Sequence, residues 1–217
     1  MKKIMFNDRY GLTQAVLEGH KTMTRRIIPD IEIDWNRRGR VTLPVSGFEH
    51  GVLFMDVRSI LHDAGICDYS APAKYQPTYK VGEEVAITQP YKNLIEQGYL
   101  CRESDGWVSE KYCTSPGYRN KMFVRADLMP HRIRITNIKV ERLQDISEED
   151  AMCEGIRQSV IEYGNKKIVQ WTYFGEKITT WFDSPREAFA ALIDRISGRG
   201  TWQNNPRVFA YTFELIK

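Results

Sequence analysis

The sequence predicts a mixed α+β fold built around a curved sheet or a small β-barrel. Strand-like runs are interleaved with a few short helical patterns, and several connections have the glycine, proline and serine content of turns. One long apolar segment also changes its alternation phase midway, which indicates a curved strand. These observations favour short helices packed around one curved sheet.

The phase change lies in the segment 131–143, which reads HRIRITNIKVERL. Ile133 and Ile135 share one parity, whereas the apolar residues that follow them have the opposite parity. A bulge or bend near Thr136 and Asn137 would bring both sets to the same face. Such bulges occur where a strand curves around a small barrel.

Composition is typical of an ordinary globular protein. The chain has 217 residues, of which 42% are hydrophobic and 27% are charged. Its 31 basic and 28 acidic residues give a net charge of +3, which is too mild to indicate a nucleic-acid binder by itself. This length favours a single domain over residues 1–217, with insertions expected at about 29–79, 91–118 and 157–183.

The amino-terminal segment MKKIMFNDRYG lacks the sustained apolar run and cleavage site of a secretory signal, so we expect a cytoplasmic protein with no membrane segment. The cysteines form no C-x-x-C pair and the histidines are equally dispersed. We therefore expect free thiols, no zinc site, no disulfide framework and no cofactor. The residues concerned are Cys67, Cys101, Cys113, Cys153, His20, His50, His62 and His131.

Two secondary-structure elements are expected near the start of the chain, and a third lies further on. A strand-like KKIMF precedes a short helix over residues 12–18, which Gly19 is well placed to end. The segment YKVGEEVAIT pairs a glycine turn with a strand containing Val85 and Ile87, whose alternation is typical of a half-buried edge strand.

Two later helices carry clear capping signals. In DISEEDAMCEG, Ser147 is the expected N-cap and Gly155 the expected stop. In DSPREAFAALIDRISG, Ser184 is the N-cap, Pro185 takes the first helical position, and an apolar stripe runs from Phe189 to Ile196. The chain then ends in RVFAYTFELIK, an apolar and aromatic strand.

The stretch EGHKTMTRR contains the first candidate for chemistry. A threonine hydroxyl needs a neighbouring base to act as a nucleophile, and a lysine can serve if desolvation lowers its pKa. Lys21 and Thr24 would share a face on a helical turn, whereas an extended strand would separate them. From spacing alone, a polar helix exit whose cations complement the helix dipole is the more common explanation.

Glu154 is the second candidate. The acids Glu148, Glu149 and Asp150 lie in the first turn of their helix, where the helix dipole favours negative charge, so capping explains them. Glu154 instead lies near the carboxyl end of the same helix, where a carboxylate is mildly disfavoured. Its position therefore calls for another explanation.

A basic run is the third candidate. Interleaved with aromatic and apolar residues, it could form a face for phosphates, and on charge alone a solvated strand face balanced by the acids of the next helix is an equal alternative. Its cations are Arg119, Lys121, Arg125, Arg132, Arg134, Lys139 and Arg142.

Four blocks of the sequence are informative when they are considered together and in their order along the chain. They read EGHKTMTRR, KVGEEVAI, RITNIKVERLQDISEEDAMCEGI and AFAALIDRISGRGTWQNNPRVFAYTFELI. The combination resembles the ASCH domain family of PUA-like β-barrels, and more closely its longer members from bacteriophages and prophages. The similar blocks cover roughly half of the chain, leaving out the insertions. The resemblance implies a small β-barrel flanked by short helices, with a cleft for RNA or nucleotides.

One branch of that family removes acyl groups from N4-acetylcytidine with a lysine, a threonine and a glutamate. Its G-x-K-T-x-T motif falls on Gly19, Lys21, Thr22 and Thr24. Its glutamate is carried onto Glu154 by the similarity of LQDISE to the family pattern. The resemblance therefore implies an amidohydrolase for N4-acylated cytosine nucleosides, without a metal or cofactor.

In this interpretation the catalytic residues are Lys21, Thr24 and Glu154. Thr22, Arg25 and Arg26 are the candidate substrate-binding residues, and a small nucleoside is the expected partner, with RNA as a second candidate. Two alternatives stay open: a non-catalytic module that binds RNA or a modified nucleotide, and an ASCH-type ribonuclease assisted by Lys21.

One departure from the family bears on the cleft. Long phage relatives usually have W-V-R-E after the central glycine turn, whereas this chain has AITQ. Thr88 and Gln89 thus replace an arginine and a glutamate, which implies altered ligand contacts or a lost role at these positions.

Overall fold

The computed structural model describes most of the chain apart from the first expected insertion. The described residues are 1–28, 77–100, 110–163, 166–173 and 180–216, together with strand backbone at 31–35, 39–43, 48–49, 52–54 and 74–75. The rest of the predicted insertions at 29–79 and 91–118 lies outside the described residues.

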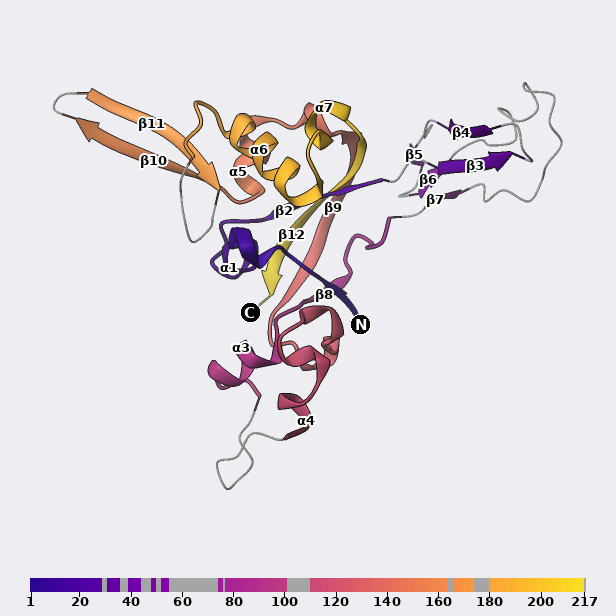
Figure 1. Ribbon diagram of the computed structural model, residues 1–217, viewed down its shortest axis with the longest axis vertical. Helices are drawn as coiled ribbons and strands as arrows, with labels where there is room; N and C mark the ends of the chain where they lie inside the picture. The colour runs from indigo at the N-terminus through magenta and orange to yellow at the C-terminus, as the bar shows by residue number, and fades with distance from the viewer. Residues whose placement is uncertain are drawn as a thin grey trace.

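The body of the protein is a five-stranded sheet in the order β1–β8–β9–β12–β2 (Figure 1). The strands β1 and β8 pair in parallel, and the other three pairings are antiparallel. The bounds are Lys2–Ile4 for β1, Met23–Ile27 for β2, Glu84–Ile87 for β8, Arg132–Arg142 for β9 and Arg207–Ile216 for β12.

The carboxyl-terminal strand β12 is covered on both faces. Its residues Val208 to Tyr211 are all buried, which explains why this strand is a nearly continuous apolar run rather than an alternating one. The strand β8 is buried in the same way, because it lies between β1 and β9. The expectation that β8 is a half-buried edge strand is therefore wrong.

The predicted bulge in β9 is confirmed. Thr212 of β12 pairs with Asn137 and Phe213 pairs with Ile135, so Thr136 has no partner on β12. The extra residue switches the parity of β9 and lets Ile138 pack against the same core as Ile135.

The mixed α+β class is confirmed, but the expected closed barrel is wrong. The strands β1 and β2 lie at opposite ends of the sheet order and do not pair with each other. The segment that follows β1 meets β2 through a side chain instead, because the Arg26 guanidinium donates to the Met5 carbonyl at 2.7 Å. The two edges thus stay apart where a barrel would close.

Short helices pack against the sheet to form the main core. The predicted α1 is confirmed as Leu12–Leu17, and Gly19 follows it with a φ of 79°. The predicted N-caps are confirmed too: the Ser147 side chain accepts from Asp150 N–H in α5, and Ser184 accepts from Glu187 N–H in α6. Further bounds are Asp8–Tyr10 for η1, Leu143–Asp145 for η5, Glu148–Cys153 for α5, Pro185–Ser197 for α6 and Thr201–Asn204 for α7.

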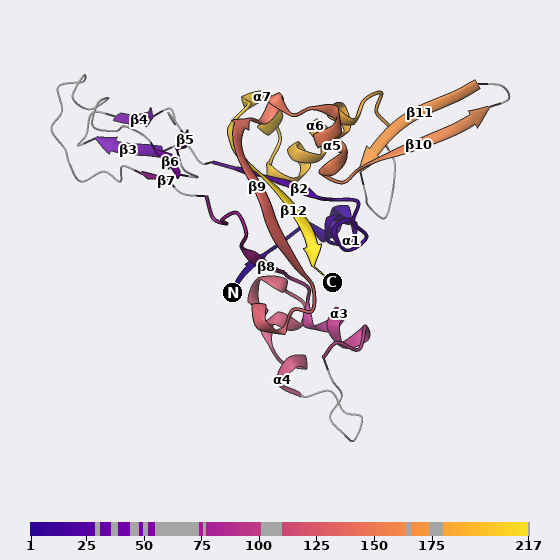
Figure 2. The same ribbon diagram turned by 180° about the vertical axis from the view of Figure 1, so that it is seen from behind.

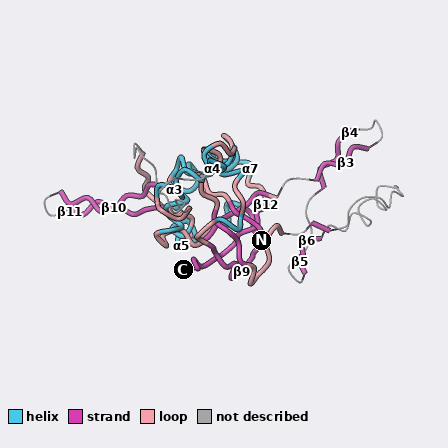
Figure 3. The backbone as a smooth tube through the Cα atoms, turned by 90° about the horizontal axis from the view of Figure 1, so that it is seen from below, coloured by secondary structure: helices cyan, strands magenta, loops and turns pink. Residues whose placement is uncertain are grey.

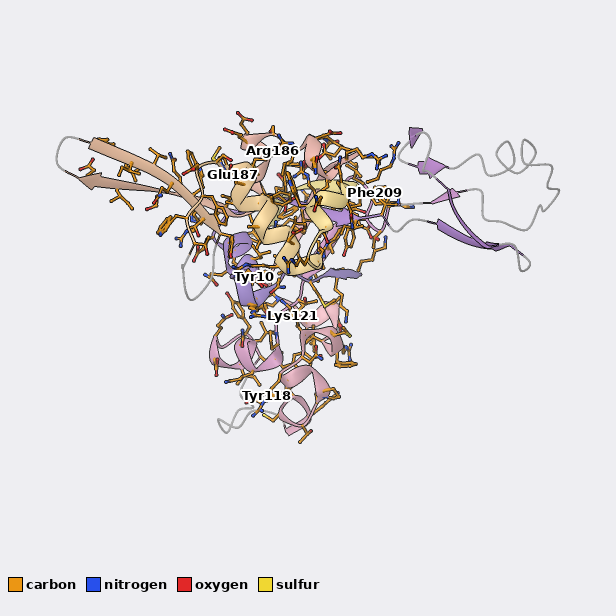
Figure 4. All side chains as sticks on the ribbon, turned by 45° about the horizontal axis from the view of Figure 1, so that its top comes forward. Tyr10, Tyr118, Lys121, Arg186, Glu187 and Phe209 are labelled. Carbon is orange, nitrogen blue, oxygen red and sulfur yellow. The ribbon has the colours of Figure 1, made fainter. Side chains whose placement is uncertain are left out.

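A second, smaller cluster packs around Ala86 of β8, at the bottom of Figure 1. Here Tyr91 and Leu94 pack with Val124 and Met129. Lys121 lies between the helices of this cluster and the body (Figure 4). It forms an ion pair with Asp8 at 2.8 Å. The elements are α3 (Tyr91–Glu96), α4 (Glu110–Cys113), η2 (Pro116–Tyr118), η3 (Lys121–Phe123) and η4 (Ala126–Leu128).

Most of the expected insertion at 157–183 is a long hairpin of β10 (Ile156–Tyr163) and β11 (Lys166–Tyr173). It extends away from the body on the side opposite to the short strands of residues 31–75 (Figures 2 and 3). Those short strands are β3 (Ile31–Trp35), β4 (Gly39–Leu43), β5 (Phe48–Glu49), β6 (Val52–Phe54) and β7 (Lys74–Tyr75).

Within the described ranges, no helix has the length and apolar character needed to cross a membrane.

Candidate functional site

A pocket of about 350 Å³ lies at the opening between β2 and the segment that follows β1. Its third wall is the carboxyl-terminal half of α6, and Glu154 reaches it from the end of α5. One part of the lining is apolar and aromatic, and the other part carries charged groups. The lining includes Phe6, Lys21, Thr24, Arg25, Arg26, Glu154, Phe189 and Ile196.

Lys21 is held by backbone contacts to two helices. Its N–H donates to the Ala15 carbonyl of α1 at 2.9 Å, and the next N–H, of Thr22, donates to the Cys153 carbonyl of α5 at 2.9 Å. Lys21 and Glu154 therefore form an isolated antiparallel bridge. The helix ends that the sequence predicts at Gly19 and Gly155 are thus the points where these two residues come together.

Gly155 has a specific steric role beside Lys21. Its φ is 96°, a left-handed conformation that favours glycine. A Cβ atom here would lie 3.3 Å from Cδ2 of Leu12 and 3.6 Å from both Cβ and Cδ of Lys21. The tight approach is to Leu12, whereas the distance to the Lys21 stem is that of ordinary van der Waals contact, so the left-handed backbone and Leu12 are what favour glycine here.

The Lys21 ammonium and the Glu154 carboxylate form a buried ion pair. Nζ of Lys21 lies 2.6 Å from Oε2 of Glu154 and donates to the Glu154 carbonyl oxygen at 2.7 Å. The two residues are 2% and 4% exposed. The lysine also lies 6.0 Å from the ring centroid of Phe6. Such a group is fixed in position and almost fully shielded from water.

Arg25 holds the other oxygen of the same carboxylate. Its Nη1 donates to Oε1 of Glu154 at 3.1 Å, its Nε donates to Glu141 at 2.8 Å, and its Nη2 donates to Asp150 at 2.8 Å. The Arg25 side chain is buried, so its charge is compensated inside the protein rather than by solvent. Lys139 also donates to Asp150, at 3.2 Å.

The pKa shifts follow from this arrangement. Burial lowers the pKa of Lys21 below its usual 10.5, although the nearby Glu154 carboxylate opposes that effect. Burial would also lower the pKa of Arg25, but the Glu154 and Glu141 carboxylates outweigh it and raise the pKa. Burial would raise the pKa of Asp150, but hydrogen bonds from Arg25 and Lys139 lower it below 3.8.

The backbone around Lys21 is extended, which decides how the neighbouring side chains are distributed. Lys21 and Arg25, four residues apart, reach the same carboxylate. Thr24 is buried and lines the same pocket, but within the described part of the chain its hydroxyl has no hydrogen bond to Lys21 or Glu154. The structure therefore brings all three candidate catalytic residues to one pocket without a formed Thr24–Lys21 hydrogen bond.

The three candidate substrate-binding residues have different environments. Arg26 is exposed and lines the pocket. Arg25 lines it as well, but its donors are engaged by carboxylates. Thr22 lies outside this pocket and lines a separate hollow beside Met152 and Cys153. Of the three, Arg26 alone combines exposure with a place in the pocket lining.

Several contributors to the site were not found from the sequence. Helix capping explains Asp150 in the sequence and no pattern singles out Glu141, yet both bind Arg25. Phe189 was assigned to an apolar stripe, and Arg25 lies 6.0 Å from its ring centroid. No sequence spacing indicates these contacts, because each joins elements that are distant in the chain.

The basic run is largely neutralised on the protein surface. Among the described residues, five of its seven cations pair with carboxylates, which agrees with a solvated, balanced face, but only the partner of Lys139 lies on the next helix as that alternative expects. The pairs are Lys121 with Asp8, Arg125 with Asp127, Arg132 and Arg134 with Glu84, and Lys139 with Asp150.

Thr88 and Gln89 lie away from the pocket lining. The Thr88 hydroxyl donates to the Ile4 carbonyl at 3.0 Å, so it ties β8 to β1. Gln89 is buried, and its Oε1 has no hydrogen-bond partner in the described structure. Among the described residues, neither Thr88 nor Gln89 forms a hydrogen bond with Lys21 or Glu154.

The described residues contain no group of three or more His, Cys, Asp and Glu side chains arranged to hold a metal ion. Comparison with protein-family models, with curated proteins and with solved structures finds no match.

Proposed function

We propose that this protein is an amidohydrolase that removes acyl groups from N4-acylated cytosine nucleosides such as N4-acetylcytidine. The observation that carries the proposal is the buried pair of Lys21 and Glu154 in a pocket that Thr24 also lines. The proposal also depends on the resemblance of the motif around Lys21 to ASCH-type amidohydrolases. The apolar wall of α6 suits a planar base or an acyl group.

The proposed first step is attack of the Thr24 hydroxyl on the amide carbonyl carbon. A new C–O bond forms as the hydroxyl proton passes to neutral Lys21. Collapse of the tetrahedral intermediate breaks the bond between the carbonyl carbon and N4, and Lys21 returns the proton to the departing amine. Water then hydrolyses the threonine ester, which releases the carboxylic acid and regenerates Thr24.

The surroundings of Lys21 support its role as the base. Burial lowers its pKa, so a larger fraction is neutral at a given pH than for an exposed lysine. Glu154 accepts from Lys21 with one oxygen and from Arg25 with the other. This arrangement supports a role for Glu154 in orienting the lysine. Substrate binding must then bring Thr24 into hydrogen-bond reach of Lys21.

The test is incubation of the purified protein with N4-acetylcytidine, with conversion to cytidine followed by absorbance and chromatography. We expect turnover in the wild type and a loss of about 100-fold or more in Thr24→Ala and in Lys21→Met. Thr24→Ser keeps a hydroxyl and should retain part of the activity. Full activity in Thr24→Ala would overturn the nucleophile assignment.

The same preparation distinguishes the alternatives. Absence of conversion together with salt-sensitive retention of RNA would favour a binding module. RNA degradation that disappears in Lys21→Met would favour a ribonuclease. Either result would replace the amidohydrolase proposal.

A further inference from the structure

Among the residues that the structure describes, the charges around the pocket balance except at one residue. Three cations and three carboxylates form one connected network, in which Lys21 and Arg25 bind Glu154, and Arg25 and Lys139 bind the remaining acids. Three positive and three negative charges sum to zero. The members are Lys21, Arg25, Lys139, Glu141, Asp150 and Glu154.

Arg26 is the remaining charged residue of the pocket lining. Among the described residues no carboxylate lies within ion-pair distance of its guanidinium. One nitrogen, Nη2, donates to the Met5 carbonyl at 2.7 Å, which fixes the group at the pocket mouth without neutralising it. The rest of its donors are open to a ligand.

The positive charge of Arg26 also acts on the buried ammonium group of Lys21. After burial and the opposing effect of Glu154, the positive charge of Arg26 is among the causes that lower the Lys21 pKa. A ligand placed with its reactive amide at Lys21 could therefore extend an anionic group to Arg26. The pocket volume of about 350 Å³ and its open side leave room for more than a nucleobase.

We infer that the substrate carries a phosphate group that binds Arg26, so that the preferred substrate is an N4-acylated cytidine nucleotide rather than the free nucleoside. A guanidinium binds phosphate through charge-assisted hydrogen bonds, often two at once. The phosphate could belong to a mononucleotide or to the backbone of a single-stranded RNA, and both present the same chemistry. This inference rests on the proposed amidohydrolase function.

The test compares kcat/KM for three substrates: N4-acetylcytidine, its monophosphates, and a short single-stranded RNA with one N4-acetylcytidine. We expect at least one phosphate-bearing substrate to exceed the free nucleoside by about tenfold or more. An advantage for the monophosphates alone would assign the phosphate to a mononucleotide, whereas an advantage for the RNA alone would assign it to a polymer. Equal kcat/KM values for all three would overturn the inference while leaving the hydrolase function intact.

Substitutions at Arg26 and at a control position test whether Arg26 causes the preference for phosphate-bearing substrates. Arg26→Gln should reduce the ratio of kcat/KM for the phosphate-bearing substrate over the nucleoside toward one, and Arg26→Lys should retain part of it. Arg119→Gln is the matched control, since Arg119 is exposed and outside the pocket lining and the change in net charge is the same. An unchanged ratio in Arg26→Gln would overturn the inference.

Ligand binding measured by calorimetry tests the phosphate site independently of the hydrolase function. If the protein hydrolyses none of the substrates, the hydrolase function fails, and the phosphate site is tested by binding of cytidine and cytidine monophosphate. Tighter binding of the monophosphate that is lost in Arg26→Gln would support the site. Equal binding of both compounds would overturn it.

Discussion

Lys21 and Glu154 are 133 positions apart in the chain, yet the lysine Nζ donates to both the side chain and the backbone carbonyl of the glutamate. The double contact arises because the two residues also face each other across a backbone bridge. A buried ion pair of this kind adds little net stability if both members are replaced together, but removal of one member leaves an uncompensated charge. The Lys21–Glu154 contact therefore predicts how substitutions at these two residues change stability and activity.

Glu154→Gln should destabilise the fold strongly. Lys21 and Arg25 would both lose a buried counter-charge, and the expected loss is about 3–5 kcal/mol of unfolding free energy. Urea denaturation followed by tryptophan fluorescence measures it. The double variant Lys21→Met with Glu154→Gln should recover part of that loss, because one of the stranded cations is gone. Additive effects of the two changes would contradict a coupled pair.

The pH dependence of hydrolysis should reflect the environment of Lys21. Its pKa is lower than 10.5 in the folded protein, and the neutral amine is the form that accepts a proton. The neutral fraction grows as the pH rises through the pKa, so kcat/KM should increase with pH and level off with an apparent pKa below 10.5. Initial rates corrected for spontaneous hydrolysis give this profile.

Lys21→Arg provides the control for that profile. An arginine keeps the charge but stays protonated throughout the accessible pH range, so activity should be lost without the appearance of a new inflection. A wild-type inflection at or above 10.5 would argue against Lys21 as the base.

Asp150 should make the fold sensitive to acid. Its pKa is below 3.8 in the folded state, so between the folded value and 3.8 the unfolded chain binds more protons. The Asp150 contribution is therefore present above about pH 3.8 and is lost as the pH falls through the folded pKa. Asp150→Asn should show a shallower loss of stability in this range, and a stability lower by about 1–3 kcal/mol at neutral pH.

Urea unfolding at a series of pH values between about 5 and 3 measures this difference. Glu149→Gln is a suitable control, because Glu149 is exposed in the same helical turn and forms no ion pair among the described residues. If Glu149→Gln and Asp150→Asn change the acid profile equally, the Arg25 contact is not its source.

Gly155→Ala should disturb both the fold and the site. A φ of 96° costs a residue with a side chain about 1–3 kcal/mol, and the added methyl group would approach Leu12 tightly while making ordinary contact with the Lys21 stem. Gly19→Ala is the matched comparison, since Gly19 also has a positive φ but has no atom within 4 Å of an added Cβ. Thermal unfolding should rank Gly155→Ala as the more damaging of the two. Equal losses would mean that the tight approach of the added methyl group to Leu12 is unimportant.

Local sequence signals predict the helix ends and the bulge of this protein, but they do not predict whether its sheet closes into a barrel. The caps at Ser147 and Ser184, the stop at Gly19 and the bulge at Thr136 depend on neighbouring residues only, and each was predictable. The closed barrel does not follow from these local signals. Curvature of one strand does not determine whether the two edge strands of a sheet meet.

The sequence by itself determined the mixed class, the helix ends and the cluster of polar residues around Lys21, because backbone preference and alternation are local properties. Tertiary structure alone decided that Lys21 and Arg25 share the Glu154 carboxylate, that Glu141 and Asp150 neutralise the arginine, and that Arg26 keeps an uncompensated charge. These outcomes depend on which distant carboxylates packing brings within hydrogen-bond distance, since a charge is neutralised by its neighbours in space.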